Sequence, residues 1–249
     1  MSIELTDVHR AFGQNEVLRG LDLDVQDGET LSIIGFSGAG KSVILKHMVG
    51  LIRPDSGTVL VDGQNVDELD VEDLNELRRD IGYVFQFAAL FDSMNIADNV
   101  AMGLRRMPEM FDEEIMSRVR ECLAMVDLEG VEDRYPSELS GGMVKRAGLA
   151  RAIATKPKYL LYDEPTTGLD PVTVTVIDRL IVRMKEELGV TGVVITHDME
   201  SAYRISDRIA MLHDGRIRTS GTVDEIKESD DLLLRSFIDG RPELVEKAS

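Results

Sequence analysis

The chain has 249 residues, of which 43% are hydrophobic and 30% are charged, which is enough for the core of one large α/β domain. Its formal net charge of −18 opposes binding to nucleic acid phosphates and to anionic lipid headgroups, so no direct partner of either kind is expected. No apolar stretch approaches the roughly 20 residues of a membrane-spanning helix, and residues 1–13 lack the basic and apolar regions of a secretory signal.

Short strands are predicted over the N-terminal part of the chain. Residues 3–8 and 21–25 alternate apolar and polar side chains, as in a half-solvated antiparallel sheet. Residues 31–34 form an apolar strand that leads into a glycine-rich loop, and residues 42–49 behind the loop lack helix breakers. The next elements expected are a strand, a charged helix and a strand over residues 58–61, 71–79 and 81–85.

The pattern becomes helical from Asp112. Four apolar residues recur on one helical face, and the positions between them are largely charged. These four are Ile115, Val119, Cys122 and Val126. Cys122 is the only cysteine, and we expect a buried, unreactive thiol. A second helix is predicted after Gly142. The basic residues placed away from its apolar stripe are Lys145, Arg146 and Arg151.

Strands and helices alternate again toward the C-terminus, which indicates a parallel sheet. The predicted order is a strand, a helix and a strand over residues 159–162, 171–188 and 192–195. The dipeptide Asp214-Gly215 predicts a hairpin between strands at residues 207–212 and 216–219. Residues 222–225 fit a capping box that opens a short helix.

The octapeptide GFSGAGKS at residues 35–42 matches the phosphate-binding pattern G-x-x-x-x-G-K-[ST], with a strand before it and a helix behind it. Glycines let successive backbone N–H groups turn onto phosphate oxygens, and the helix N-terminus adds partial positive charge. Lys41 is expected to reach the β- and γ-phosphates, and the Ser42 hydroxyl to bind Mg²⁺. Val43 stands where a dinucleotide fingerprint needs its third glycine, so that fold is not supported.

Two carboxylates follow the apolar run at residues 159–162. At the carboxyl end of a buried strand facing the phosphate loop, Asp163 would hold Mg²⁺ through water. Glu164 would polarise the attacking water.

Further segments resemble the ATP-binding-cassette (ABC) ATPase family. The pentapeptide LSGGM at residues 139–143 resembles its LSGGQ signature, and residues 163–170, DEPTTGLD, resemble its Walker B end and D-loop. Gln86 is similar to the Q-loop glutamine, His197 to the switch histidine, and Phe12 to the aromatic that stacks on adenine. The resemblance covers nearly the whole chain, in the family's order.

This resemblance implies an α/β fold, a P-loop NTPase with a RecA-like core, an antiparallel β-subdomain and an ABC α-helical subdomain. Residues 1–249 would form one nucleotide-binding domain, with the helical subdomain at about residues 96–158 and a C-terminal tail at about residues 238–249. The residues implied to bind nucleotide are Phe12, Ser37, Gly38, Ala39, Gly40, Lys41, Ser42, Gln86, Ser140, Gly141, Gly142, Asp163 and Asp170. The implied catalytic residues are Lys41, Gln86, Glu164 and His197, and the implied Mg²⁺ ligands are Ser42, Gln86 and Asp163.

Partners are also implied by the resemblance. The signature would close on the γ-phosphate held by a second copy of the chain, so a nucleotide-sandwich dimer is expected. Met143 replaces the usual glutamine of the signature, which leaves the backbone cradle intact but not the usual side-chain contact. The apolar run at residues 87–91 and Met94 would meet a membrane permease, with burial between lobes as the alternative reading.

Three segments narrow the resemblance to the ATPases of MCE-linked, Mla-type phospholipid transporters. They are FQFAALFDSMNIADNVA, SELSGGMVKRAGLARAIA and GVVITHDMESAYRISDRIAML. This implies a permease, an MCE-domain protein and a STAS-domain protein as partners, at the cytoplasmic face of the inner membrane. The alternatives are a cassette for another substrate and a non-transport ABC ATPase, although the chain has neither the second cassette nor the long coiled coil usual in the latter. A GTPase is disfavoured because the N-K-x-D motif is missing.

Overall fold

The computed structural model describes residues 2–107 and 109–241 and divides into two compact units. The first unit comprises Met1–Asp70 and Val193–Ser249, and the second comprises Val71–Gly192. The predicted tail therefore lies largely outside the described residues, since residues 242–249 are not among them. Within the described ranges, every helix is too short or too polar to cross a bilayer.

An antiparallel sheet in the first unit has the strand order β2-β1-β4-β5. Its strands are β1 (Ile3–Phe12), β2 (Asn15–Val25), β4 (Ser56–Val61) and β5 (Gln64–Asn65). The alternation predicted for residues 3–8 is confirmed from Ile3 to Thr6, but a register shift between Leu5 and Val8 then buries Val8 and exposes Asp7. Both predicted strands are longer than the alternation indicated, since the hairpin pairs Phe12 with Asn15.

The first unit also holds the strands β10-β9-β3 in that spatial order, followed by residues 193–195 of β8. These are β3 (Thr30–Ile34), β8 (Thr191–Ile195), β9 (Arg208–His213) and β10 (Arg216–Thr222). β3 runs parallel to β9, and β9 and β10 form the predicted hairpin. The parallel pairing confirms the sheet type expected from the alternation of strands and helices.

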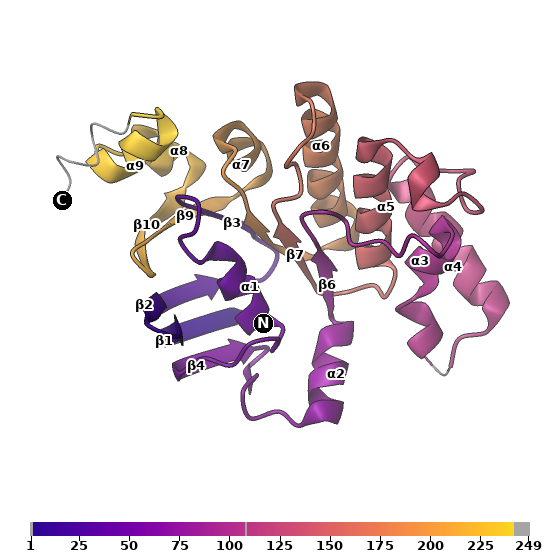
Figure 1. Cartoon of the computed structure of the whole chain (residues 1–249), viewed down its shortest axis with the longest axis horizontal. Coiled ribbons are helices and arrows are strands. Elements are labelled where there is room, and N and C mark those ends of the chain that lie inside the picture. Colours follow the sequence, from indigo (N-terminus) through magenta and orange to yellow (C-terminus); the bar gives the residue numbers. More distant parts are fainter. Residues whose placement is uncertain (1, 108, 242–249) are drawn as a thin grey trace. The chain divides into compact units, whose positions relative to one another are not determined.

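The helices of the first unit are α1 (Lys41–Met48), α7 (Met199–Ile205), α8 (Val223–Glu228) and α9 (Leu232–Ile238). α8 begins at the predicted capping box, in which Thr222 and Glu225 bond reciprocally. Figure 1 shows α8 and α9, in yellow, beside β10 at the C-terminal end. The sequence did not predict α7 and α9. α9 joins the core through Leu233 and Leu234, which pack in one buried cluster with Ile34 of β3.

The second unit contains a parallel strand pair, β6 (Ile81–Val84) and β7 (Tyr159–Asp163). Its helices are α2 (Val71–Arg79), α3 (Ile96–Ala101), α4 (Asp112–Met125), α5 (Gly141–Ile153) and α6 (Pro171–Leu188). α3, α4 and α5 pack on one another (Figure 1). Cys122 on α4 is fully buried, and burial raises the pKa of its thiol to about 11, as expected for an inert cysteine.

Candidate functional site

The glycine-rich loop lies between β3 and α1, as predicted. Gly35, Gly38 and Gly40 have φ angles of 150°, 80° and 100°, a region that favours glycine. A side chain at Gly40 would overlap the Cγ1 of Val17, so β2 packs directly against the start of α1. Both constraints fix glycine in the loop, and the loop leads straight into a helix N-terminus, where backbone dipoles favour an anion.

Lys41 is buried, and its ammonium group donates to the carbonyl oxygens of Gly35 at 2.7 Å and Phe36 at 3.1 Å. The cation that is predicted to bind phosphate is thus held within the loop itself. Next to it is a hollow of about 410 Å³, lined by residues 15–17, 36–39 and 213–215. The hollow gives the loop an open side.

Two further predicted residues belong to the same unit. Phe12 ends β1 with 45% of its surface exposed, and the guanidinium carbon of Arg10 lies 4.8 Å from its ring centroid. His197 is exposed two residues after β8. The N–H of Thr196 donates to the carbonyl of Ile33 at 3.3 Å, so the chain reaches His197 beside the strand that feeds the phosphate loop.

The predicted acidic pair ends β7 in the second unit. The Tyr83 hydroxyl donates to the Asp163 carboxylate at 3.3 Å, and the Thr167 hydroxyl donates to the Glu164 carboxylate at 2.6 Å. Burial and the nearby Asp163 charge raise the pKa of Tyr83, which keeps this phenol a donor. Glu164 has a φ of 52°, and a left-handed non-glycine residue costs about 1–2 kcal/mol. Such strain is typical of functional positions.

Gln86 follows β6 and lies at the same sheet edge as Asp163, because β6 and β7 run parallel with Val84 opposite Tyr162. The loop behind Gln86 is fixed by helix α5. Lys145 donates to the Gln86 carbonyl, and Arg151 donates to the carbonyls of Ala88 and Ala89, each at 2.6 Å.

The signature segment forms the N-terminus of α5. Ser140 is the N-cap, and its hydroxyl accepts the N–H of Met143 at 3.3 Å. A side chain at Gly142 would overlap the methyl group of Thr173, so the signature packs against the start of α6. Asp170, predicted to contact nucleotide, caps α6 by accepting the N–H groups of Val172 and Thr173. Hydrogen bonds to its carboxylate lower the pKa of Asp170. The bond from the Thr173 hydroxyl has the largest effect, and the bond from the Thr173 N–H comes next.

Sequence reasoning missed three contacts in this unit. The helical pattern puts Lys145 away from the apolar stripe of its helix, yet Lys145 is only 8% exposed. The sequence predicts Tyr83 as a strand residue, and the structure adds a hydrogen bond from its hydroxyl to Asp163. Thr167 belongs to the D-loop pattern, and the structure adds a hydrogen bond from its hydroxyl to Glu164. The periodicity of apolar residues does not indicate any of these three contacts, because each depends on a partner distant in the sequence or on a strained turn.

Comparison with known proteins gives a consistent result. Residues 18–167 match the family described as ABC transporter. The chain is 38% identical over 241 residues to the "Probable ribonucleotide transport ATP-binding protein mkl" of Mycobacterium leprae, covering 97% of this chain and 70% of that protein. It is 41% identical over 255 aligned residues to "Protein TRIGALACTOSYLDIACYLGLYCEROL 3, chloroplastic" of Arabidopsis thaliana, with coverages of 96% and 73%. It is 40% identical over 232 residues to the "Sulfate/thiosulfate import ATP-binding protein CysA" of Pseudomonas aeruginosa, with coverages of 92% and 69%.

Solved structures agree. The dimeric structure of MJ0796, a bacterial ABC transporter cassette, superposes with a TM-score of 0.82 at 36% identity, covering 89% of this chain and 98% of that one. A post-hydrolysis state of the same cassette, bound to ADP and Pi, gives 0.81 at 35% identity and the same coverage. The structure of cbiO1 from Clostridium perfringens gives 0.84 at 29% identity, with coverages of 98% and 97%.

The donor set fits ATP with Mg²⁺. In residues 2–107 and 109–241, no group of three or more His, Cys, Asp or Glu side chains could hold a metal ion. Mg²⁺ needs no such cage, because it keeps waters and phosphate oxygens and takes only one or two protein ligands. The chain is an ATPase that binds ATP with Mg²⁺. By its sequence and its fold, it belongs to the ABC transporter family.

Proposed function

We propose that this ATPase works as a homodimer in which each signature segment closes on the ATP held by the partner copy. The chain has one P-loop and one signature segment. Ser140 sits at a helix N-terminus, which favours an anion just as the phosphate loop does. In a symmetric dimer, the P-loop of each copy would face the N-terminus of α5 of the other copy. One nucleotide would then lie between each such pair of anion-binding elements.

The residue roles proposed are those that the resemblance to the ABC ATPase family implies, and the contacts of Glu164 and Lys41 support two of them. Bound ATP with Mg²⁺ supplies the γ-phosphoryl group that water attacks. Glu164 accepts a proton from that water, and the Thr167 hydroxyl holds the carboxylate in place. Lys41 exchanges its carbonyl partners for phosphate oxygens. His197 would contact the γ-phosphate and Phe12 would stack on adenine, while Ser42, Gln86 and Asp163 would hold Mg²⁺.

The observation that carries the proposed coupling to a permease is an exposed aromatic groove of about 490 Å³ in the second unit. Its lining includes Arg78, Tyr83, Phe85, Phe91, Arg106 and Arg151. Phe91 of this lining is 51% exposed, and Phe87, four residues earlier in the chain, is 79% exposed, which argues against burial of the whole 87–91 run. An apolar patch rimmed by arginines suits an amphipathic segment of a membrane subunit. The chain would then lie at the cytoplasmic face of the membrane.

The substrate proposed is phospholipid, moved by a complex that includes MCE-domain and STAS-domain proteins. Support comes from the Mla-like sequence segments and from the relative whose name contains a glycolipid, trigalactosyldiacylglycerol. The second candidate is an importer of a small anion, which the name of the CysA relative favours.

The test is to express the chain with its genomic membrane neighbours, purify the complex and identify bound lipid by mass spectrometry. Reconstituted complex should move labelled phospholipid between vesicles when ATP is present, and should not when Glu164→Gln is used. A complex that carries no lipid and instead accumulates sulfate in vesicles would replace the lipid proposal with the importer.

The proposed groove is tested in the same preparation. Phe87→Ser combined with Phe91→Ser should abolish co-purification of the permease, whereas Phe111→Ser, an exposed aromatic outside the groove, should retain it. If the double variant recovers as much permease as the parent, the groove is not the docking surface.

A further inference from the structure

Two basic side chains of α5 hold the backbone of the loop that carries Gln86. Lys145 donates to the Gln86 carbonyl, and the two terminal nitrogens of Arg151 donate separately to Ala88 and Ala89. We propose that Lys145 and Arg151 are positioning residues that lock the 86–89 loop to α5, so that Gln86 and the signature Ser140 move as one block. This inference rests on the proposed roles of Gln86 and Ser140.

The backbone of the loop needs such support. Ala88 and Ala89 have φ angles of 57° and 49°, two consecutive left-handed residues that are not glycine. Their conformation persists only if surrounding contacts over-determine it. The fork of Arg151 meets both carbonyls of this strained pair, and a guanidinium presents two parallel donors where an ammonium presents a point charge. Arg151 therefore has a geometric task that lysine does not fulfil.

Close packing adds to the hydrogen bonds. Ala88 is 1% exposed, and a Cβ added at Gly148 of α5 would lie 3.0 Å from the Ala88 methyl. The helix thus approaches the loop to within side-chain contact over the same turns that carry the two cations. Sliding the loop along α5 would leave the buried ammonium group of Lys145 without the Gln86 carbonyl as acceptor, which is unfavourable.

The lock connects three functional positions. α5 begins at the Ser140 cap, Lys145 lies about 1.4 turns further, and Arg151 follows after about another 1.7 turns. The loop it holds carries Gln86 at one end and the exposed Phe87 next to it. The Arg151 guanidinium also lies 6.0 Å from the Phe85 ring centroid, at the proposed permease groove. A push on that groove would displace the proposed metal ligand and the signature together.

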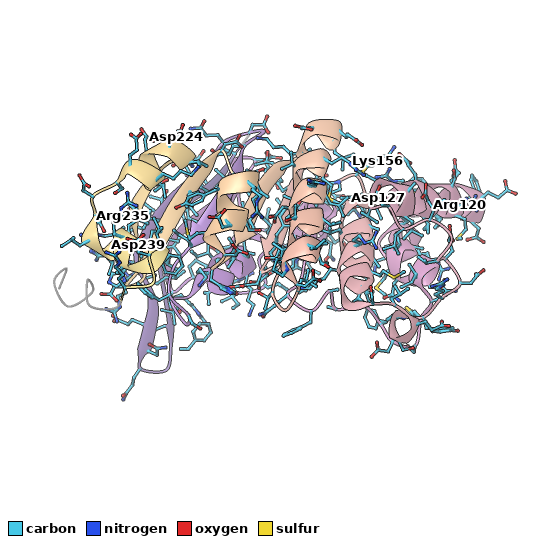
Figure 2. All side chains as sticks on the ribbon, turned by 90° about the horizontal axis from the view of Figure 1, so that it is seen from above. Arg120, Asp127, Lys156, Asp224, Arg235 and Asp239 are labelled. Atoms are coloured by element: carbon cyan, nitrogen blue, oxygen red, sulfur yellow. The ribbon has the colours of Figure 1, made fainter. Side chains whose placement is uncertain are left out.

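A double-mutant cycle tests the lock. Arg151→Lys keeps the charge and removes the fork, so ATPase activity should need about tenfold more Mg²⁺ for half-maximal rate. In a Gln86→Ala background, the same substitution should add little, because its effect passes through Gln86. Arg120→Lys on the outer side of α4 is the matched control, since Arg120 is exposed (Figure 2), and should leave the Mg²⁺ requirement unchanged. Lys145→Gln serves as the second variant if Arg151→Lys melts below the assay temperature.

The outcomes separate the lock from the proposed role of Gln86. If the effects of Arg151→Lys and Gln86→Ala on the Mg²⁺ requirement multiply in the double variant, the proposed lock is wrong. It is also wrong if Arg151→Lys alone has the same Mg²⁺ requirement as the control variant. If Gln86→Ala alone leaves the Mg²⁺ requirement unchanged, the role of Gln86 fails. Hydrogen exchange of the residue 87–90 amides then decides about the lock: faster exchange in Arg151→Lys supports it, and unchanged exchange overturns it.

Discussion

Phe237 of α9 packs edge to face against Phe36 of the phosphate loop, with ring centroids 5.3 Å apart and an interplanar angle of 87°. The Phe36 carbonyl accepts a hydrogen bond from the Lys41 ammonium group at 3.1 Å. α9 is itself anchored by Arg235 (labelled in Figure 2), which donates to the carbonyl of Ser229 at 2.7 Å. The C-terminal helix therefore braces the backbone that orients the phosphate-binding cation.

Phe237→Ala should weaken this brace. The loss of an aromatic pair and part of its buried surface should lower the unfolding free energy by about 1–3 kcal/mol. Because the loop would then be less ordered, the dissociation constant for ATP should rise about fivefold in calorimetry. Leu232→Ala on the same helix is the control, because Leu232 is 44% exposed. Unchanged ATP affinity together with a lowered melting temperature would show that α9 stabilises the fold without ordering the loop.

Lys41→Ala should reduce ATP affinity by about tenfold or more, because hydrogen bonds to charged groups contribute about 1.5–3 kcal/mol. Lys46→Ala lies on the same helix and should bind ATP like the parent. Calorimetric titration of both variants at matched ionic strength distinguishes a specific contact from general charge. Equal affinities for the two variants would remove Lys41 from the phosphate site.

His47 makes the stability of the α1 region depend on pH. Its ring is buried on α1, and Nδ1 lies 2.7 Å from the Ile52 carbonyl. Burial lowers the pKa of His47 below its ordinary 6.5, so the unfolded chain binds this proton more readily than the folded chain. The stabilising contribution is complete above pH 6.5 and is lost as pH falls toward the folded pKa, at up to about 1.4 kcal/mol per pH unit.

Urea unfolding at several values between pH 5.5 and pH 7.5 measures this dependence. His47→Gln should flatten the slope relative to the parent, whatever its absolute stability. Parallel curves for parent and His47→Gln would show that His47 does not titrate in this range.

Much of the fold follows from local pattern. The strands β3 and β7 were predicted from short apolar runs. Such runs occur because every residue of β3, and Tyr159 to Tyr162 of β7, is buried. α9 was missed because three consecutive leucines at residues 232–234 have no helical period. The remaining signal was the cap, since the carboxylate of Asp231 accepts the N–H of Leu234.

The site divides in the same way. Lys41 and Asp163 were predicted from a loop pattern and a strand end, and Ser140 from the resemblance to the family's signature; the structure places them at a phosphate-type loop, at the end of β7 and at the N-cap of α5. The lock by Lys145 and Arg151 depends on left-handed Ala88 and Ala89, and alanine has no preference for that conformation. A contact that depends on an unfavourable backbone conformation has no signature in the local sequence. The same holds for a contact between residues as far apart in the sequence as Phe36 and Phe237.

The sandwich dimer is tested most directly by light scattering of Glu164→Gln with ATP and Mg²⁺. Without the proton acceptor, hydrolysis should slow by about 10²–10⁴-fold, and the mass should double. Glu187→Gln, an exposed acid on α6, should remain monomeric under turnover. Adding Ser140→Arg to Glu164→Gln should abolish the dimer. A stalled protein saturated with ATP and Mg²⁺ that stays monomeric, with or without its membrane subunit, would contradict the account.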